Sequence, residues 1–258
     1  MPGDGFSFHP ICRDLRLNFT EADHSYIDSW GRDYTSATRL IHDAFPAFDA
    51  DAVASRLAAE KGTEKEAVLQ EWQERARKGT RAHENCEYQI LGDYGNMHTP
   101  ESDQEQDCFA AAWEEVEKIK AAGFAVLEPE KLVFSPRFRI SGSIDLFAVH
   151  AEGWYMLLDW KYIRNFRKKA YGGETGIIPP TAHLQNCNAV HYSLQLNIYE
   201  TILKQEGYIP RDAEVKKILN VYDKNRRQFQ QYIVEDMLYE ALDLASWNIT
   251  GNYNEIPF

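Results

Sequence analysis

The sequence predicts a mixed α/β (α+β) fold in which one mixed β-sheet is flanked by helices. Apolar residues recur at helical spacing through residues 36–122, and strand-like apolar runs fill residues 124–162. One more helix, two strands and a final helix complete the pattern. Helices on both sides of a strand meander are typical of a layered domain built around a single sheet.

The chain is long enough for one large domain with a substantial core. It has 258 residues, of which 44% are hydrophobic and 26% are charged, as is ordinary for globular domains. No apolar stretch approaches the length of a membrane span. The start of the chain carries no basic segment followed by an apolar run, so we expect no secretory signal, a cytoplasmic protein and no membrane partner.

Charge and cysteine content argue against several kinds of site. The formal net charge of −12 disfavours broad electrostatic binding of nucleic acid, although a local basic patch remains compatible with it. The four cysteines are widely spaced and form no Cys-x-x-Cys pair, so the sequence indicates neither a zinc ribbon nor a compact disulfide framework. We therefore expect reduced thiols.

The N-terminal part is predicted to form a small hairpin and then helices. Ser36 is a suitable N-cap, and Thr63 with Glu66 matches the capping box that opens a helix. Gly79 is expected to break that helix, after which Thr80 caps the next one. The elements expected here are a hairpin at 19–35 and helices at 36–44, 49–61, 63–77, 81–91 and 105–122.

The rest of the chain is predicted to supply the main strands. The turn signal Ala151-Glu152-Gly153 separates two apolar runs, 138–149 and 154–162, which we expect to pair as antiparallel neighbours. Glycine and proline pairs mark residues 163–187 as a loop. The remaining elements expected are strands at 124–134, 214–222 and 228–234 and helices at 188–206 and 235–247.

Two carboxylates and one ammonium are expected to meet at the end of this hairpin. Antiparallel pairing brings Asp145 on the first strand close to Asp159 on the second. Lys161 is two residues beyond Asp159 and therefore lies on the same strand face. Crowded carboxylates repel each other unless a cation lies between them, and Mg2+ or Mn2+ prefers oxygen ligands. The pattern favours a metal site, although Asp-Trp-Lys alone is also typical of a solvated strand end.

Two predicted helices add polar residues at a spacing of four, which places each pair on one helix face. His83 and Glu87 form the first pair, and Gln195 and Tyr199 form the second. In order, the chain contains Gly-Thr-x-x-His-x-x-x-Glu, Gly-Ser-Ile-Asp, Asp-Trp-Lys and Gln-x-x-x-Tyr. This ordered set resembles the RecB-type branch of the PD-(D/E)XK nuclease superfamily. Residues 24–40 also resemble the N-terminal segment of phage-type and mitochondrial RecB-like exonucleases.

The resemblance implies a restriction-endonuclease-like core with a divalent-metal site. Asp145 and Asp159 are implied to hold one or two Mg2+ or Mn2+ ions. His83 and the backbone carbonyl of Trp160 are implied to complete the ligand set. Glu87 is either a further ligand or an exposed helix charge. Only Cys187 lies downstream of the core motifs, so we expect no iron–sulfur cluster.

The same resemblance implies roles for three more residues. Lys161 is implied to orient or deprotonate the attacking water and to offset charge that develops on the phosphate. Gln195 and Tyr199 are implied to contact the phosphate or to support Lys161, and the alternative is that they are core-facing helix residues. The implied reaction is in-line attack of water on a phosphodiester, which leaves a 5′-phosphate and a 3′-hydroxyl.

The function expected is a metal-dependent deoxyribonuclease. We expect an exonuclease that acts on DNA ends or single strands in recombination, repair or replication, with a possible protein partner from that process. Residues 1–78 are expected to form a hairpin and helical cap that restricts access to a free end, and residues 79–258 the nuclease core. The alternatives are an endonuclease of the same fold and a nucleic-acid-binding protein that has lost catalysis.

The densest basic cluster of this acidic chain follows Asp-Trp-Lys directly. It is either a solubilising loop or a loop that contacts phosphates and stacks an aromatic ring on a base. Arg81, near His83, is expected to add to a second basic edge. The DNA-binding residues expected are Arg81, Arg164, Arg167, Lys168, Lys169 and Tyr171.

Overall fold

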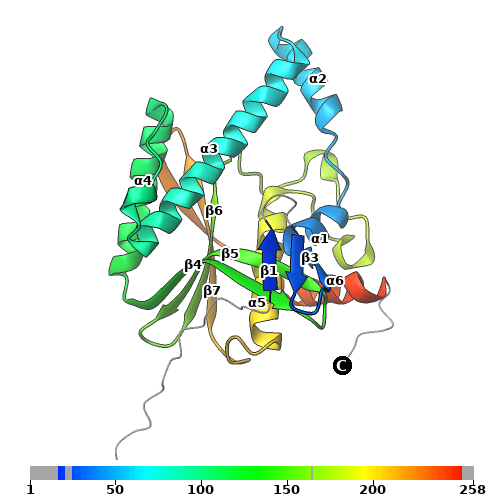
Figure 1. Cartoon of the computed structure of the whole chain (residues 1–258). Coiled ribbons are helices and arrows are strands. Elements are labelled where there is room, and N and C mark those ends of the chain that lie inside the picture. Colours follow the sequence, from blue (N-terminus) through cyan, green and yellow to red (C-terminus); the bar gives the residue numbers. More distant parts are fainter. Residues whose placement is uncertain (1–16, 21–24, 164, 252–258) are drawn as a thin grey trace, which may run out of the picture.

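The computed structural model describes residues 17–20, 25–163 and 165–251. Within these residues eight strands form one mixed sheet in the order β1-β2-β3-β5-β6-β7-β8, and β4 pairs with β5 beside this path. The expected mixed sheet flanked by helices is confirmed (Figure 1). The strands are β1 (Leu17–Thr20), β2 (Ser25–Asp28), β3 (Asp33–Ser36), β4 (Phe124–Ser135), β5 (Ile140–His150), β6 (Tyr155–Lys161), β7 (Val215–Asp223) and β8 (Gln228–Ile233).

The helices begin and end close to the predicted residues, with one exception. Ser36 caps α1 as expected, since its hydroxyl accepts a hydrogen bond from the Arg39 amide at 3.1 Å. The helices are α1 (Ala37–Asp43), α2 (Ala50–Lys61), α3 (Lys65–Leu91), α4 (Asp103–Ala121), α5 (Asn188–Gln205) and α6 (Leu238–Thr250). Three short 3-10 helices are η1 (Tyr94–Asn96), η2 (Tyr171–Gly173) and η3 (Pro179–Thr181).

The exception is α3, which is one helix of 27 residues where two were predicted. Gly79 lies inside it, and the Thr80 hydroxyl donates to the carbonyl of Ala76 in the preceding turn instead of capping a new helix. The capping box was also wrong, because the N-cap is Glu64 and makes no side-chain cap bond. A glycine inside a helix costs only about 1 kcal/mol, which packing of the helix on the sheet offsets. The expected boundary between residues 78 and 79 falls within this helix.

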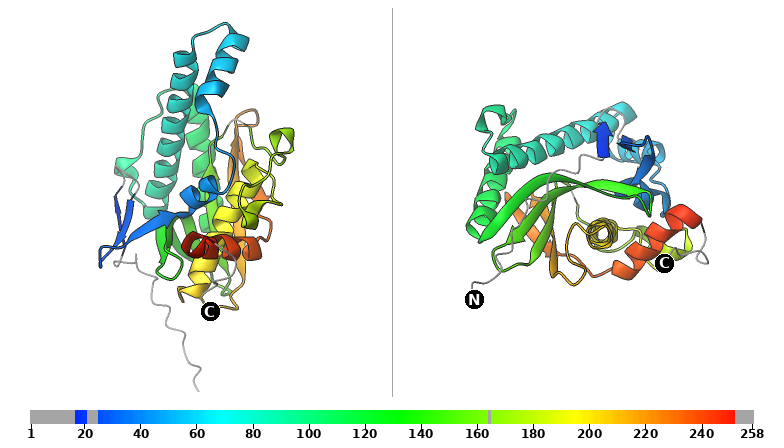
Figure 2. Two further views of the ribbon diagram at one scale, coloured as in Figure 1. Left: turned by 90° about the vertical axis from the view of Figure 1, so that its right-hand side faces the viewer. Right: turned by 60° about the horizontal axis from the view of Figure 1, so that its bottom comes forward.

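The sheet separates two helical layers (Figure 2). Side chains alternate between the faces of β5 and β6, so Leu146 and Leu158 pack under α3 and α4. Phe147 and Leu157, one residue away, pack instead in the larger core with α1, α5 and α6. Both strands are therefore buried on both faces, which explains why each reads as a continuous apolar run.

One edge of β5 changes partner in the middle of the strand. β3 pairs with it in parallel, with Ser36 opposite Ser141, and β6 pairs antiparallel from Leu146 onward. Residues 142–145 lie between these two pairings. Asp145 therefore lies where this edge of β5 pairs with neither β3 nor β6, next to the carboxyl end of β6.

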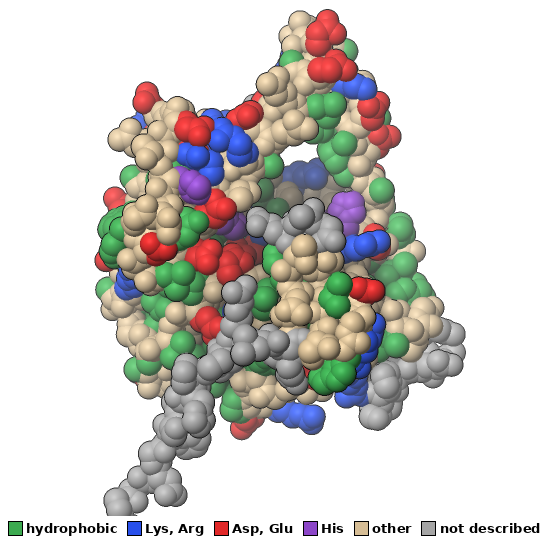
Figure 3. Space-filling model, viewed as in Figure 1, with side chains coloured by type: hydrophobic (Ala, Val, Ile, Leu, Met, Phe, Trp, Pro, Cys, Tyr) green, Lys and Arg blue, Asp and Glu red, His purple; other side chains and the backbone are tan. Residues whose placement is uncertain are grey.

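The pair α2 and α3 projects from the body of the molecule (Figures 1 and 2). Its two helices pack on each other through Ala54, Ala58 and Val68. The surface is hollowed beneath the pair (Figure 3). No helix in the described part of the chain is long and apolar enough to cross a lipid bilayer.

Candidate active site

The ends of β5 and β6 bring two acids and one lysine together. The Asp145 carboxylate accepts a hydrogen bond from the Trp160 amide at 2.8 Å and so links the two strands. The Lys161 ammonium lies 2.8 Å from Oδ1 and 2.7 Å from Oδ2 of Asp159. Asp159 and Lys161 therefore share a strand face, as their spacing of two predicts.

His83 reaches the same place from the lower half of α3. Its Nδ1 lies 3.4 Å from Oδ2 of Asp145, and the ring hydrogen-bonds with the backbone of Trp160. Gly79, one turn earlier, lies next to the chain leaving β6, since a Cβ added there would make an ordinary contact of 3.5 Å with Cβ of Tyr162. The imidazole thus approaches the acidic hairpin from the face opposite α5.

Burial and mutual repulsion set the charges of this cluster. Burial, only partly offset by Lys161, raises the pKa of Asp159 to about 6 and raises the pKa of Asp145 as well. Burial disfavours the charge of Lys161, but Asp159 and Asp145 outweigh it and raise the pKa of the ammonium. Burial and the nearby ammonium lower the pKa of His83 to about 4, so its imidazole is neutral at pH 7.

A further acid, Glu130 of β4, faces the cluster and was not predicted from the sequence. The pairs Pro129 with Leu146 and Lys131 with Ile144 place Glu130 opposite Asp145. Its backbone is left-handed, with φ of 47°, and its carboxylate accepts a hydrogen bond from the Ser143 hydroxyl at 2.6 Å. The pKa of Glu130 is raised to about 8, first because surrounding protein removes water from its carboxylate and second because Asp145 repels its negative charge.

Glu87 lies one turn beyond His83 on α3 and is half-buried. Its negative charge acts on Glu130, as does that of Asp145, so Glu87 belongs to the same acidic surroundings. The structure therefore brings together His83, Glu87, Asp145, Asp159, Trp160 and Lys161, all predicted, and adds Glu130.

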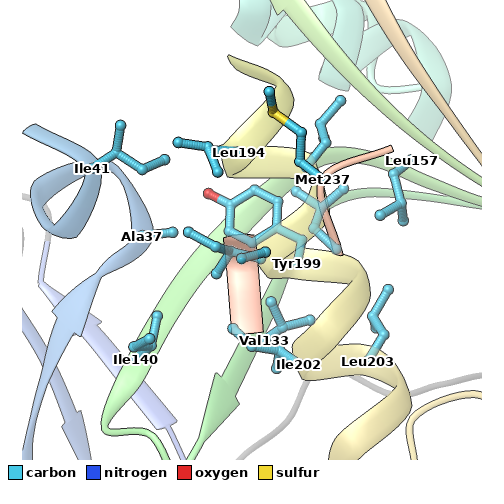
Figure 4. Packing of buried hydrophobic residues seen from close by; sticks show 14 of the residues in the cluster. Ala37, Ile41, Val133, Ile140, Leu157, Leu194, Tyr199, Ile202, Leu203 and Met237 are labelled. Atoms are coloured by element: carbon cyan, nitrogen blue, oxygen red, sulfur yellow. The ribbon is translucent and has the colours of Figure 1, made fainter. Parts of the chain in front are cut away.

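Gln195 and Tyr199 of α5 lie beneath this cluster. The Gln195 amide donates to the Tyr199 hydroxyl at 3.1 Å, and Tyr199 is buried in the main core (Figure 4). Tyr199 also occupies the space that a side chain at Gly142 would need, since an added Cβ would lie 2.4 Å from its Cε1. The glycine of Gly-Ser-Ile-Asp thus allows α5 to approach β5 just before Asp145.

We expect Gly142→Ala to destabilise the protein by about 1–3 kcal/mol, because the added methyl overlaps the Tyr199 ring and forces one of them to move. Equilibrium unfolding in urea measures this change. Gly95→Ala is a matched control, since nothing lies within 4 Å of a Cβ at that position. Equal stability of Gly142→Ala and the parent protein would contradict the packing described.

Tyr192, one turn before Gln195, lies against the catalytic candidate Lys161. The Lys161 ammonium is 4.8 Å from the centroid of the Tyr192 ring. A cation over an aromatic face is stabilised, and here the ring limits where the ammonium can move. Tyr192 was not predicted from its position in the chain, because the contact joins the start of α5 to the end of β6.

The predicted basic residues that the structure describes do not gather at one place. Arg81 pairs with Glu105 at 2.8 Å and with Glu101 at 3.0 Å, and so connects α3 with the segment that begins α4. Lys168 lies 4.8 Å above the Tyr232 ring of β8, whereas Arg167 is joined by its backbone to the start of α5.

Of the last three predicted DNA-binding residues, the structure describes two. Lys169 and Tyr171 are exposed. Arg164 lies outside the described residues.

The donor set suits a hard divalent ion. Two carboxylates, one buried and one 13% exposed, a neutral imidazole and a backbone carbonyl are ligands that such ions accept. Among the described residues, no three His, Cys, Asp or Glu side chains already stand in a metal-binding arrangement. Lys161 holds the oxygens of Asp159, so Asp159 has to turn from the ammonium to share an ion with Asp145.

Comparison with known proteins identifies the family. A family model described as the PD-(D/E)XK nuclease superfamily matches residues 31–250, which include the acidic hairpin, His83 and the Gln195–Tyr199 pair. A search of curated proteins found no match. The family match supports a nuclease with DNA as substrate, and nucleases of this superfamily generally use divalent metal ions. Since the match covers most of the chain and its motifs meet in one place, the chain belongs to the PD-(D/E)XK nuclease superfamily.

Proposed function

We propose that the protein is a Mg2+- or Mn2+-dependent deoxyribonuclease that acts from free DNA ends or on single strands. The observation that carries this proposal is the convergence of Asp145, Asp159, Lys161 and His83 at a cavity whose wall includes α3. The two acids would bind the metal ion and the lysine would stabilise the phosphate during hydrolysis. The α2–α3 pair would restrict how a DNA strand reaches them.

Asp145, Asp159, His83 and the carbonyl of Trp160 would hold the ion. The bound ion would supply Lewis-acid stabilisation of the phosphate and a lower pKa for water. The Trp160 amide fixes the orientation of Asp145 at 2.8 Å, so this carboxylate is already positioned. His83 is neutral and therefore has a lone pair available.

Lys161 would act directly on the reacting phosphate. Its ammonium is charged, its side chain is only 17% exposed, and it is confined between Asp159 and the Tyr192 ring. Stabilising the negative charge that grows on phosphate oxygens is most effective where donors are fixed and water is excluded. Within the described chain neither Gln195 nor Tyr199 hydrogen-bonds with Lys161, and we propose that they position β5 instead.

Digestion of end-labelled linear DNA and of circular single- and double-stranded DNA, each with Mg2+ or Mn2+, tests the proposal. We expect linear DNA to be lost from its ends while circles survive. Cleavage of circles would instead indicate an endonuclease. No cleavage of any of these substrates with either ion would overturn the proposed activity.

Mn2+ binding should weaken as the pH falls below about 6, because protons then compete for the Asp159 carboxylate, whose pKa is raised to about 6. Protonation of Asp159 alone raises the apparent dissociation constant by about tenfold per pH unit below that value, and Asp145, whose pKa is also raised, makes the dependence steeper. Titration calorimetry over a range of pH measures this. His83 does not add to the effect, since its pKa is lowered to about 4. A constant affinity down to about pH 4.5 would contradict the assignment.

A further inference from the structure

We propose that one strand of the DNA substrate runs from the catalytic cluster along Tyr162 into a basic cleft lined by Arg75, Lys78 and Lys224. The proposal rests on the nuclease function proposed above and adds the path of the strand. None of these four residues belongs to the motifs by which the family is recognised.

Two adjoining cavities mark this path. The first has a volume of about 410 Å3 and is lined by His83 and Lys161, together with Trp72 and Thr80 of α3. The second has a volume of about 370 Å3 and lies between α3 and the turn after β7. Both volumes fall in the range of sites that hold small ligands, about 300–1,000 Å3.

The two cavities share Arg75, Tyr162 and Ile163 on their walls. They are therefore neighbours separated by Tyr162, the residue that directly follows Lys161. A strand whose scissile phosphate lies at Lys161 can therefore continue past this tyrosine into the second cavity, because Tyr162 lines both cavities.

The charge of the second cavity fits a phosphate backbone. Four cations and two carboxylates line it, in a chain whose net charge is −12. Glu71 takes up part of this charge, since it pairs with Lys61 at 2.9 Å and with Arg75 at 2.7 Å. In the described part of the chain Lys78 and Lys224 have no carboxylate within ion-pair distance, so both ammonium groups are available to phosphates.

Tyr162 offers a supported ring for a base. It stacks on Tyr222 with 5.3 Å between ring centroids and 20° between ring planes. Tyr222 is buried and packs against Phe229, with ring centroids 5.5 Å apart. The Tyr222 ring is therefore held in place beneath Tyr162. A fixed aromatic ring beside a basic cleft is the arrangement with which proteins hold single strands without reading their sequence.

Binding of a fluorescein-labelled single-stranded oligonucleotide to the intact chain, in EDTA to prevent cleavage, tests the two lysines. The slope of log affinity against log salt should fall by about 0.7 for each of Lys78→Gln and Lys224→Gln, the value for one phosphate contact on a single strand. Arg211→Gln is the matched control, because it removes a charge from a shallow cavity beyond the carboxyl end of α5 and should leave the slope unchanged.

Tyr162 is tested in the same assay with two substitutions. Tyr162→Leu should weaken binding roughly tenfold through loss of stacking, while Tyr162→Phe, which keeps the ring, should bind like the parent protein. Thermal unfolding of each variant shows whether the fold is retained. Equal losses for Leu and Phe would overturn the stacking role.

The outcomes separate this path from the proposed activity. If the parent protein binds and cleaves single strands but the lysine variants keep its affinity and salt slope, the path is wrong and the nuclease proposal stands. If the variants bind more weakly as expected but no DNA is cleaved with either metal, the path is supported and the proposed activity fails. If the parent protein does not bind single strands, the path is overturned.

Discussion

Lys161→Ala should lower the rate of DNA cleavage by about 10²–10³-fold while Mn2+ binding is retained. The ammonium is the fixed cation beside the acidic pair, 2.7 Å from Asp159, and removing one preorganised donor from a transition state costs that much. Initial rates on end-labelled linear DNA at saturating Mg2+ measure the loss.

The binding part of this prediction distinguishes a catalytic from a structural lysine. Without its ammonium, both oxygens of Asp159 are released, so Mn2+ should bind at least as tightly as to the parent protein. Lys118→Ala on α4 is a suitable control, since its side chain is 70% exposed and far from the hairpin in sequence. Unchanged cleavage by Lys161→Ala would show that the phosphate is stabilised by another group.

Asp159→Asn should abolish cleavage, with a loss of about 10³-fold or more, and should remove the stabilisation that Mn2+ gives to the folded protein. An amide keeps the shape of the side chain but removes the negative charge that a divalent ion requires. An ion at about 100 times its dissociation constant stabilises the folded state by about 2.7 kcal/mol. Thermal unfolding with and without Mn2+ therefore shows the loss of binding directly.

Glu152→Gln makes the same change on the turn of the same hairpin. Its carboxylate is 79% exposed and lies away from the cluster, so both cleavage and the Mn2+ effect should match the parent protein. If Asp159→Asn keeps the Mn2+ stabilisation, the ion binds elsewhere and Asp159 serves only to hold Lys161.

Local signals predicted most of the fold. Ser36 begins α1 as predicted, and α2 ends at the predicted residue 61, followed by the left-handed Gly62, because capping and left-handed glycine are decided within a few residues. Gly79 was misread for the opposite reason. Whether a glycine breaks a helix depends on the packing of the turns on either side, and α3 packs on α2 above it and on the sheet below it.

In the candidate site, only the residues that belong to the sequence motifs could be predicted. The acids at 145 and 159 and the lysine at 161 are linked by a single tight turn, so antiparallel pairing alone brings them together. Glu130 was not predicted, because its position opposite Asp145 depends on the register between β4 and β5. Tyr192 and the cleft at Lys224 depend on how distant elements pack, which no spacing in the sequence records.

The central claim is that Asp145, Asp159 and His83 surround one ion pocket. Crystals of the protein soaked in Mn2+ and measured near the manganese absorption edge test it most directly. The account predicts an anomalous peak in contact with carboxylate oxygens of Asp145 and Asp159 and with the His83 ring, and Lys161 turned from Asp159. A peak away from these side chains, or an Asp159 still held by Lys161 beside an empty pocket at saturating Mn2+, would contradict it.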